Sequence, residues 1–176
     1  MATREPGGTP LGDRLRAVFV EPGLAISPLA EAFVVNASRA QHVDDVIDPS
    51  LRDGAWVVCD RFAGATLAYQ GYGRGVDLDV LRTLAAVATR ARTPDVTFLV
   101  DVSVELSYAR VTARARARGE GIDRLERESA AFHERVRDGY LALARADPSF
   151  VVLDGALGPE LVCEAAWNVL VAKFRV

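Results

Sequence analysis

The apolar residues of the chain include three short continuous runs, each of which ends in an aspartate. They occupy residues 55–60, 96–101 and 150–154. Because these runs are continuous and rich in β-branched residues rather than alternating with polar ones, they predict buried strands. Their final aspartates, Asp60, Asp101 and Asp154, are then expected at the carboxyl edge of a sheet, where α/β proteins bind ligands.

Between these runs the apolar residues recur at helical spacing. Asp77 is a capping candidate ahead of Leu78, Leu81, Leu84 and Ala85. Further helices are predicted over residues 10–20, 28–48, 103–118, 125–146 and 159–174. Strands that alternate with helices predict an α/β fold, with a mostly parallel sheet covered by helices on both faces.

The composition predicts one compact domain over residues 1–176, since half of the chain is hydrophobic. A net charge of -3 gives no general attraction to nucleic acid or anionic membranes, and we expect neither as a partner. The two cysteines, Cys59 and Cys163, show no metal-ligand spacing, which favours a reducing cytoplasm. No stretch approaches the roughly 20 apolar residues that cross a bilayer.

Several polar residues are candidates for phosphate chemistry. Arg61 follows a predicted strand, and its planar guanidinium suits a phosphate, although a salt bridge to Asp60 explains it equally well. Arg110, Arg114 and Arg118 would form one helical stripe beside a Gly-rich break, which fits either a solvated face or a mobile lid. Asp60 could hold magnesium-bound water, orient Arg61 or cap a helix.

Five motifs along the chain together resemble the bacterial thymidylate kinase family. They are TREPGGTPLG at residues 3–12, DRF at 60–62, AYQGYGR at 68–74, PDVT at 94–97 and DRLE at 123–126. The resemblance covers nearly the whole chain. It implies a P-loop NTPase-like three-layer α/β sandwich that transfers the γ-phosphoryl group of ATP to dTMP with Mg²⁺, for dTTP biosynthesis, and it implies a homodimer.

The resemblance also implies roles for individual residues and a lid at about residues 114–126. The implied catalytic residues are Arg61, Arg118 and Arg124. The implied contacts to dTMP are Glu5, Pro6, Arg39, Arg61, Thr66, Tyr69 and Gln70. The residues expected near the cofactor are Asp60, Asp123 and Glu126. No metal-ligand set is assigned.

The sequence departs from the family at the donor site. Phosphoryl transfer needs a Gly-rich loop with a lysine and a Ser or Thr, but the only lysine is Lys173. The resemblance therefore implies that the P-loop and the first, central strand are missing, so that the chain is a truncated kinase. Two strand edges would then be unpaired, each lost hydrogen bond costing on the order of 1 to 3 kcal/mol.

The acceptor site also departs from the family pattern. Val35 stands where the family usually has a phenylalanine, and Gly64-Ala65 replaces a more polar pair. Phe33 cannot take over the direction of Val35, since two helical residues point roughly 200° apart. These departures leave the base selectivity open.

Two alternatives follow from the same residues. One is a non-catalytic nucleotide-binding relative, or a remnant of the kinase. The other is a nucleoside kinase, which the cationic Arg39 and Arg61 disfavour because its acceptor is uncharged.

Overall fold

In a computed structural model, the structure describes residues 1–119 and 121–175. Glu120, which belongs to the expected lid, and Val176 lie outside the described residues. The chain divides into two compact units. The first comprises Met1–Thr93 and Asp123–Gly139, and the second comprises Pro94–Ile122 and Tyr140–Val176. Each unit is described by itself.

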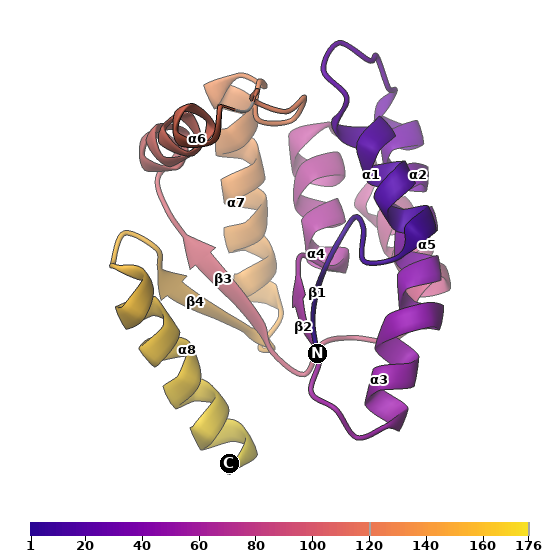
Figure 1. Ribbon diagram of the computed structural model, residues 1–176, viewed down its shortest axis with the longest axis vertical. Coiled ribbons are helices and arrows are strands. Elements are labelled where there is room, and N and C mark those ends of the chain that lie inside the picture. Colours follow the sequence, from indigo (N-terminus) through magenta and orange to yellow (C-terminus); the bar gives the residue numbers. More distant parts are fainter. Residues whose placement is uncertain (120, 176) are drawn as a thin grey trace. The chain divides into compact units, whose positions relative to one another are not determined.

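A pair of parallel strands organises the first unit. Strand β1 (Ala2–Arg4) pairs with β2 (Val58–Asp60), so that Arg4 lies opposite Asp60 (Figure 1). The ladder continues for one more bond, from the Glu5 amide to the Asp60 carbonyl at 2.9 Å. Glu5 and Arg61 are therefore the first residues beyond the carboxyl ends of the two strands.

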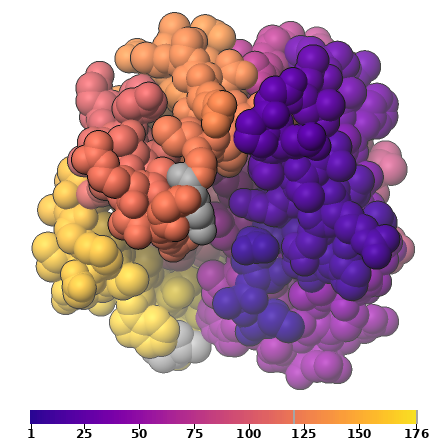
Figure 2. Space-filling model, turned by 45° about the horizontal axis from the view of Figure 1, so that its top comes forward, coloured from indigo at the N-terminus to yellow at the C-terminus, as the bar shows by residue number. Residues whose placement is uncertain are grey.

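Helices surround this pair and form the core of the first unit. They are α1 (Pro10–Val20), α2 (Pro28–His42), the π-helix η1 (Val43–Ile47), α3 (Asp48–Arg52), α4 (Ala63–Thr66), the π-helix η2 (Leu67–Gly73), α5 (Leu78–Thr89) and the first part of α7 (Ala130–Ala146). Helix α2 packs between α1 and α5. Ala32 on α2, Val43 on η1 and Leu81 on α5 are fully buried. In Figure 2 the indigo and violet segments of this unit form one continuous surface.

Capping side chains fix where these helices begin. The hydroxyls of Thr9 and Ser27 accept the amides of Gly12 and Ala30, and Pro occupies the first turn of both α1 and α2. Asp77 accepts the amides of Asp79 and Val80 at the start of α5. These capping residues and prolines are helix N-terminal signals that can be recognised in the sequence alone.

The second unit contains the other pair of parallel strands. Strand β3 (Thr97–Asp101) pairs in register with β4 (Phe150–Asp154), and α8 (Pro159–Phe174) packs on β4 (Figure 1). Helix α6 (Val104–Arg118) begins at its cap Ser103. Within this unit Lys173 donates to the Asp95 carbonyl at 2.8 Å.

Most of the predicted elements are confirmed, and the differences have physical causes. The helix predicted over residues 28–48 continues to Arg52, because the π-helical turn η1 leads directly into α3. Pro49 lies in the first turn of α3, where its missing N–H is tolerated. The helix predicted from residue 125 begins only at Ala130. The turn before it is held by Asp123 and Glu126, each of whose carboxylates accepts the other's backbone amide.

The sheet also differs from the single one that the sequence predicts. Among the described residues the strands form two separate pairs, β1–β2 and β3–β4, both parallel. Val58 is 66% exposed on β2, and Val100 on β3 is about half exposed. None of the described helices is long and apolar enough to cross a membrane.

Candidate functional site

A buried ion pair joins the loop after β1 to helix α2. Nε of Arg39 donates to Oε2 of Glu5 at 2.8 Å, and both side chains are 2% exposed. The other carboxylate oxygen, Oε1, lies 2.9 Å from Nδ1 of His42, which donates because it faces a carboxylate. His42 is also bonded through Nε2 to the Thr3 hydroxyl at 2.7 Å. The end of β1 is therefore locked to the last turn of α2.

The remaining nitrogens of Arg39 reach two further segments. Nη1 donates to Asn36 Oδ1 at 2.9 Å and Nη2 donates to Thr66 Oγ1 at 3.1 Å. The guanidinium also lies over the ring of Phe62, 5.5 Å from its centre. A guanidinium has five N–H groups. The three bonds to Glu5, Asn36 and Thr66 fix its plane and leave two N–H groups without a bond to any described residue.

Arg61 has a strained backbone at the end of β2. Its φ angle is 68°, a left-handed conformation that non-glycine residues rarely adopt. Strain of this kind costs about 1–3 kcal/mol and collects at functional sites. The exposed side chain turns toward Tyr69, with Nη2 3.5 Å from the hydroxyl and the guanidinium 5.0 Å from the ring centre. Arg61 and Tyr69, both expected to contact dTMP, therefore lie against each other, while their roles stay a prediction.

The loop that contains Pro6 is anchored on α2. The Gly7 amide donates to Ser38 Oγ at 3.1 Å, and the Pro6 carbonyl accepts from Arg16 at 3.1 Å. Gly8 has a φ of 79°, and a Cβ there would lie 2.9 Å from the ring of His42. The loop can approach α2 closely only because this position is glycine.

Gln70 lies in a second buried cluster, which is centred on Glu31. The Gln70 amide nitrogen donates to Oε2 of Glu31 at 3.0 Å, and both residues are at most 2% exposed. Arg74 donates through Nε to Oε2 of Glu31 at 3.4 Å, and its Nη2 forms an ion pair with Oε1 at 3.2 Å. Arg124 donates to Oε1 at 2.5 Å. Sequence reasoning missed Glu31 and His42. Glu31 shares the helical spacing of Val35 and Arg39, which is the signal that could have placed it on the buried face.

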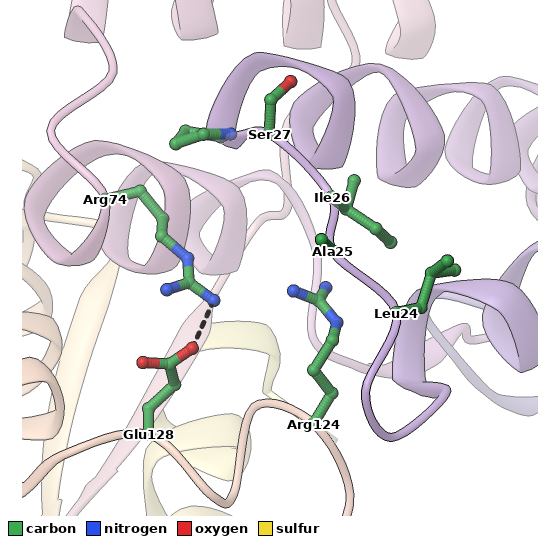
Figure 3. A pocket seen from close by; sticks show the side chains of 8 residues that line it. Leu24, Ala25, Ile26, Ser27, Arg74, Arg124 and Glu128 are labelled. Atoms are coloured by element: carbon green, nitrogen blue, oxygen red, sulfur yellow. Dashed lines mark ion pairs between the residues drawn. The ribbon is translucent and has the colours of Figure 1, made fainter.

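A pocket of about 440 Å³ opens beside this cluster, within the first unit. Arg74, Arg124 and Glu128 line it opposite residues 24–28, and Arg74 is paired with Glu128 at 2.7 Å (Figure 3). Arg124 also donates through Nε to the Phe19 carbonyl at 2.9 Å. Its Nη2 is buried without an acceptor among the described residues, so a water or a ligand acceptor fits there.

The other residues predicted at the site are placed as follows. Asp60 ends β2 and is exposed. Asp123 and Glu126 accept each other's backbone amides in the turn that contains Arg124, and their expected role near the cofactor stays a prediction. Arg118 ends α6 in the second unit, directly before the left-handed Gly119. Its catalytic role stays a prediction.

Three metal-ligand types converge near β2 without forming a magnesium site. Ligand atoms of Glu5, His42 and Cys59 lie within 4.8 Å of one another. Mg²⁺ prefers oxygen ligands, whereas Glu5 and His42 are already bonded to each other. Burial above all, together with the charges of Glu5 and Asp60, raises the pKa of the Cys59 thiol to about 12, although Arg39 opposes this shift. Cys59 therefore stays protonated and donates to the Arg61 carbonyl at 3.0 Å.

Parallel strands with arginines gathered at their carboxyl ends define an α/β protein that is equipped to bind a phosphorylated ligand. Comparison with known proteins narrows this class. The sequence profile of the thymidylate kinase family matches residues 1–166. The chain belongs to the thymidylate kinase family, which makes it a nucleoside monophosphate kinase.

Individual relatives agree with this assignment. The chain is 52% identical over 157 residues to a thymidylate kinase of Geobacter sp. (strain M21), a match that covers 88% of the chain and 70% of the relative. It is 48% identical over 167 residues to a thymidylate kinase of Carboxydothermus hydrogenoformans, covering 95% and 78%. A crystal structure of thymidylate kinase from Ehrlichia chaffeensis is similar with a TM-score of 0.72 and 31% identity, covering 97% and 79%. The fold is thus of the P-loop NTPase-like α/β type.

Proposed function

We propose that the complete protein transfers the γ-phosphoryl group of ATP to dTMP and so forms dTDP and ADP. This proposal rests on one observation. Two arginines from separate segments contact the same helical run, which is formed by α4 and η2. Arg39 donates to Thr66, and Arg61 lies over Tyr69, three residues further along. Two cationic groups and an aromatic ring then converge at the carboxyl end of the β1–β2 pair, as a charged nucleotide requires.

Each of these residues has a distinct task in the proposal. Arg61 binds the acceptor phosphate through its planar guanidinium. The ring of Tyr69 packs on the sugar or the base, and the free N–H groups of Arg39 donate to acceptors on the nucleotide. Glu5 holds Arg39 in place through the buried bond described above. The loop with Pro6 closes this side of the site, since it is anchored to Ser38 and Arg16.

ATP with Mg²⁺ is the phosphoryl donor in this proposal. Mg²⁺ at such sites is held by one or two carboxylates together with the nucleotide phosphates, and it neutralises charge that develops on the transferred group. Among the described residues the exposed Asp60 at the end of β2 fits as one such carboxylate. The Glu5–His42–Cys59 cluster does not fit, for the reasons given above.

We also propose that the complete enzyme holds a further strand and a phosphate-binding loop. Two observations support this. The second edges of β2 and of β3 have no ladder partner among the described residues, and apolar Val58 and Val100 on these strands are exposed. Inner strands of parallel sheets are normally paired and covered on both faces. The sequence also lacks the Gly-Lys-Ser or Gly-Lys-Thr that a donor site uses.

A cytoplasmic homodimer is the state that we propose for the enzyme. Leu29 and Phe33 lie one helical turn apart on α2 and are about half exposed. An exposed apolar stripe of this kind fits a contact between two copies. The outward position of Phe33 and the burial of Val35 also agree with the expectation that Phe33 does not replace Val35.

The proposal is tested by steady-state kinetics of the native full-length protein with dTMP. Replacing Arg61 by alanine should raise KM for dTMP at least tenfold. The matched control is Arg82→Ala, since Arg82 is an exposed arginine paired to Asp79 on the surface of α5. Unchanged kinetics of the Arg61 variant would remove Arg61 from the site. Binding of dTMP without any turnover, even with ATP and Mg²⁺, would favour the non-catalytic alternative.

A further inference from the structure

Three side chains of metal-ligand type meet beside the β1–β2 pair, although they come from separate segments. Glu5 follows β1, His42 ends α2 and Cys59 lies on β2. One ligand atom from each residue lies within 4.8 Å of the other two. Oε1 of Glu5 and Nδ1 of His42 are only 2.9 Å apart. A carboxylate, an imidazole and a thiol therefore converge on one point of the first unit.

We propose that Oε1 of Glu5, Nδ1 of His42 and Sγ of Cys59 form a binding site for Zn²⁺. Zn²⁺ binds oxygen, nitrogen and sulfur ligands at about 2.0–2.3 Å, which places the ligand atoms of a tetrahedral site about 3.3–3.6 Å apart. The three side chains reach this spacing by shifts of about 1 Å, and water fills the fourth position. A set with nitrogen and sulfur selects Zn²⁺ over Mg²⁺. The inference goes beyond the proposed kinase function and does not depend on it.

The ion needs no separate cavity because it takes the place of protons. In the metal-free protein the Cys59 thiol donates to the Arg61 carbonyl, and Nδ1 of His42 donates to Glu5. When Zn²⁺ binds, the thiol proton leaves to solvent, and the imidazole stays neutral with its proton on Nε2. The two anionic ligands then offset the charge of the ion, as a buried cation requires. Cys59 is partly exposed, so the ion reaches the cluster at this residue.

Two of the three ligands already have the outer contacts that orient a metal ligand. The Thr3 hydroxyl lies 2.7 Å from Nε2 of His42 and is able to accept its proton. The second carboxylate oxygen of Glu5 accepts from Nε of Arg39 at 2.8 Å. Outer bonds of this kind fix the direction of a ligating imidazole or carboxylate, and their removal lowers metal affinity about 10–100-fold. The site is therefore largely oriented before the ion arrives.

Zn²⁺ binding to the native full-length protein, free of nucleotides, tests the proposal. Equilibrium dialysis followed by metal analysis measures the affinity and the stoichiometry. Co²⁺ in place of Zn²⁺ reports a thiolate ligand through its sulfur-to-metal charge-transfer absorption. We expect one tightly bound Zn²⁺ per chain, with an affinity that falls at least a hundredfold in Cys59→Ser, since a serine hydroxyl stays protonated. The matched control is Cys163→Ser on the exposed surface of α8, which should bind like the wild type.

Thr3→Val tests the geometry of the site without removing a ligand. It deletes the acceptor for Nε2 of His42, so Zn²⁺ affinity should fall about 10–100-fold while the Co²⁺ absorption band remains. Thermal unfolding of each metal-free variant shows whether it is folded. Cys59→Ala takes the place of Cys59→Ser if the serine variant does not fold, and the same loss of affinity is expected.

Four results would overturn the inference. They are the absence of saturable Zn²⁺ binding, an affinity of Cys59→Ser within threefold of the wild-type value, a Co²⁺ band that is lost in Cys163→Ser instead of Cys59→Ser, and an unchanged affinity of Thr3→Val. The last result would remove Nδ1 of His42 from the ligand set. Because all of these readouts are measured without turnover, they are independent of whether the protein phosphorylates dTMP.

Discussion

Glu5 and Arg39 stand 34 positions apart in the sequence, yet their side chains form an ion pair of 2.8 Å that is almost completely buried. This pair joins the Pro-Gly-Gly loop to the helix that carries Val35, and through Arg39 it reaches Thr66. A buried charge is tolerated only while its partner is present. The acceptor side of the proposed site is therefore organised by a pair that also stabilises the fold.

Removing Glu5 should destabilise the protein strongly. In Glu5→Ala the guanidinium of Arg39 stays buried without its counter-charge, and breaking a buried pair in this way costs about 3–5 kcal/mol. Urea denaturation of the wild type and the variant measures this free energy of unfolding. The exposed pair Arg82–Asp79 is the control, and Asp79→Ala should cost at most about 1 kcal/mol through that contact. Equal losses in the two variants would show that burial of the Glu5–Arg39 pair has no special effect.

Arg61 should reveal stored backbone strain when glycine and alanine variants are compared. Both variants lack the guanidinium, so both should lose the use of dTMP. Glycine adopts φ near 68° freely, whereas alanine keeps the left-handed penalty of roughly 1–2 kcal/mol. Arg61→Gly should therefore unfold at a higher temperature than Arg61→Ala. If alanine were the more stable of the two, the strain would not be present in solution.

The two cysteines should differ sharply in reactivity. Because burial raises the pKa of Cys59 to about 12, its reactive thiolate is scarce at pH 8, whereas Cys163 is exposed on α8. Iodoacetamide at pH 8 should modify Cys163 first in the native protein, and both cysteines only after denaturation. Peptide mass mapping distinguishes the two sites. Modification of Cys59 in the folded protein at a rate near that of Cys163 would contradict its protonated, hydrogen-bonded state.

His133 should make the stability of the protein fall at acid pH. Burial lowers the pKa of His133 below 6.5, against the partial opposition of Glu128, Asp123 and Glu126. Below pH 6.5 the unfolded chain binds the proton more readily than the folded one, so stability is fully present above 6.5 and is lost as pH falls through the folded pKa. His133→Gln should flatten this part of the curve of unfolding free energy against pH. Parallel curves for wild type and variant would exclude the contribution.

Much of the fold was predictable because its signals are local. Proline in the first turn and Ser or Asp caps mark the starts of α1, α2 and α5, and the bounds of α1 and α8 were predicted correctly. The late start of α7 was not predictable from periodicity. Leu125 fits the helical pattern, but Asp123 and Glu126 close a turn across that position.

The site was predictable only in part. Motif resemblance indicated Arg39, Arg61, Thr66 and Tyr69, whose mutual contacts the structure contains. Two buried residues were missed, Glu31, which contacts Gln70, and His42, which contacts Glu5. In the sequence, a buried acid or histidine on a helix cannot be distinguished from any other polar residue, because its role depends on charged groups from distant segments. Arg124, for example, contacts Glu31 across 93 positions of the sequence.

The most direct test of the account is product analysis with the native full-length protein, ATP, Mg²⁺ and dTMP. Chromatography of the nucleotides should show dTDP and ADP formed in equal amounts, with at least a tenfold slower rate for Arg61→Ala at a dTMP concentration below the wild-type KM. Formation of ADP without dTDP, or no turnover by a protein that binds dTMP, would contradict the proposed kinase activity.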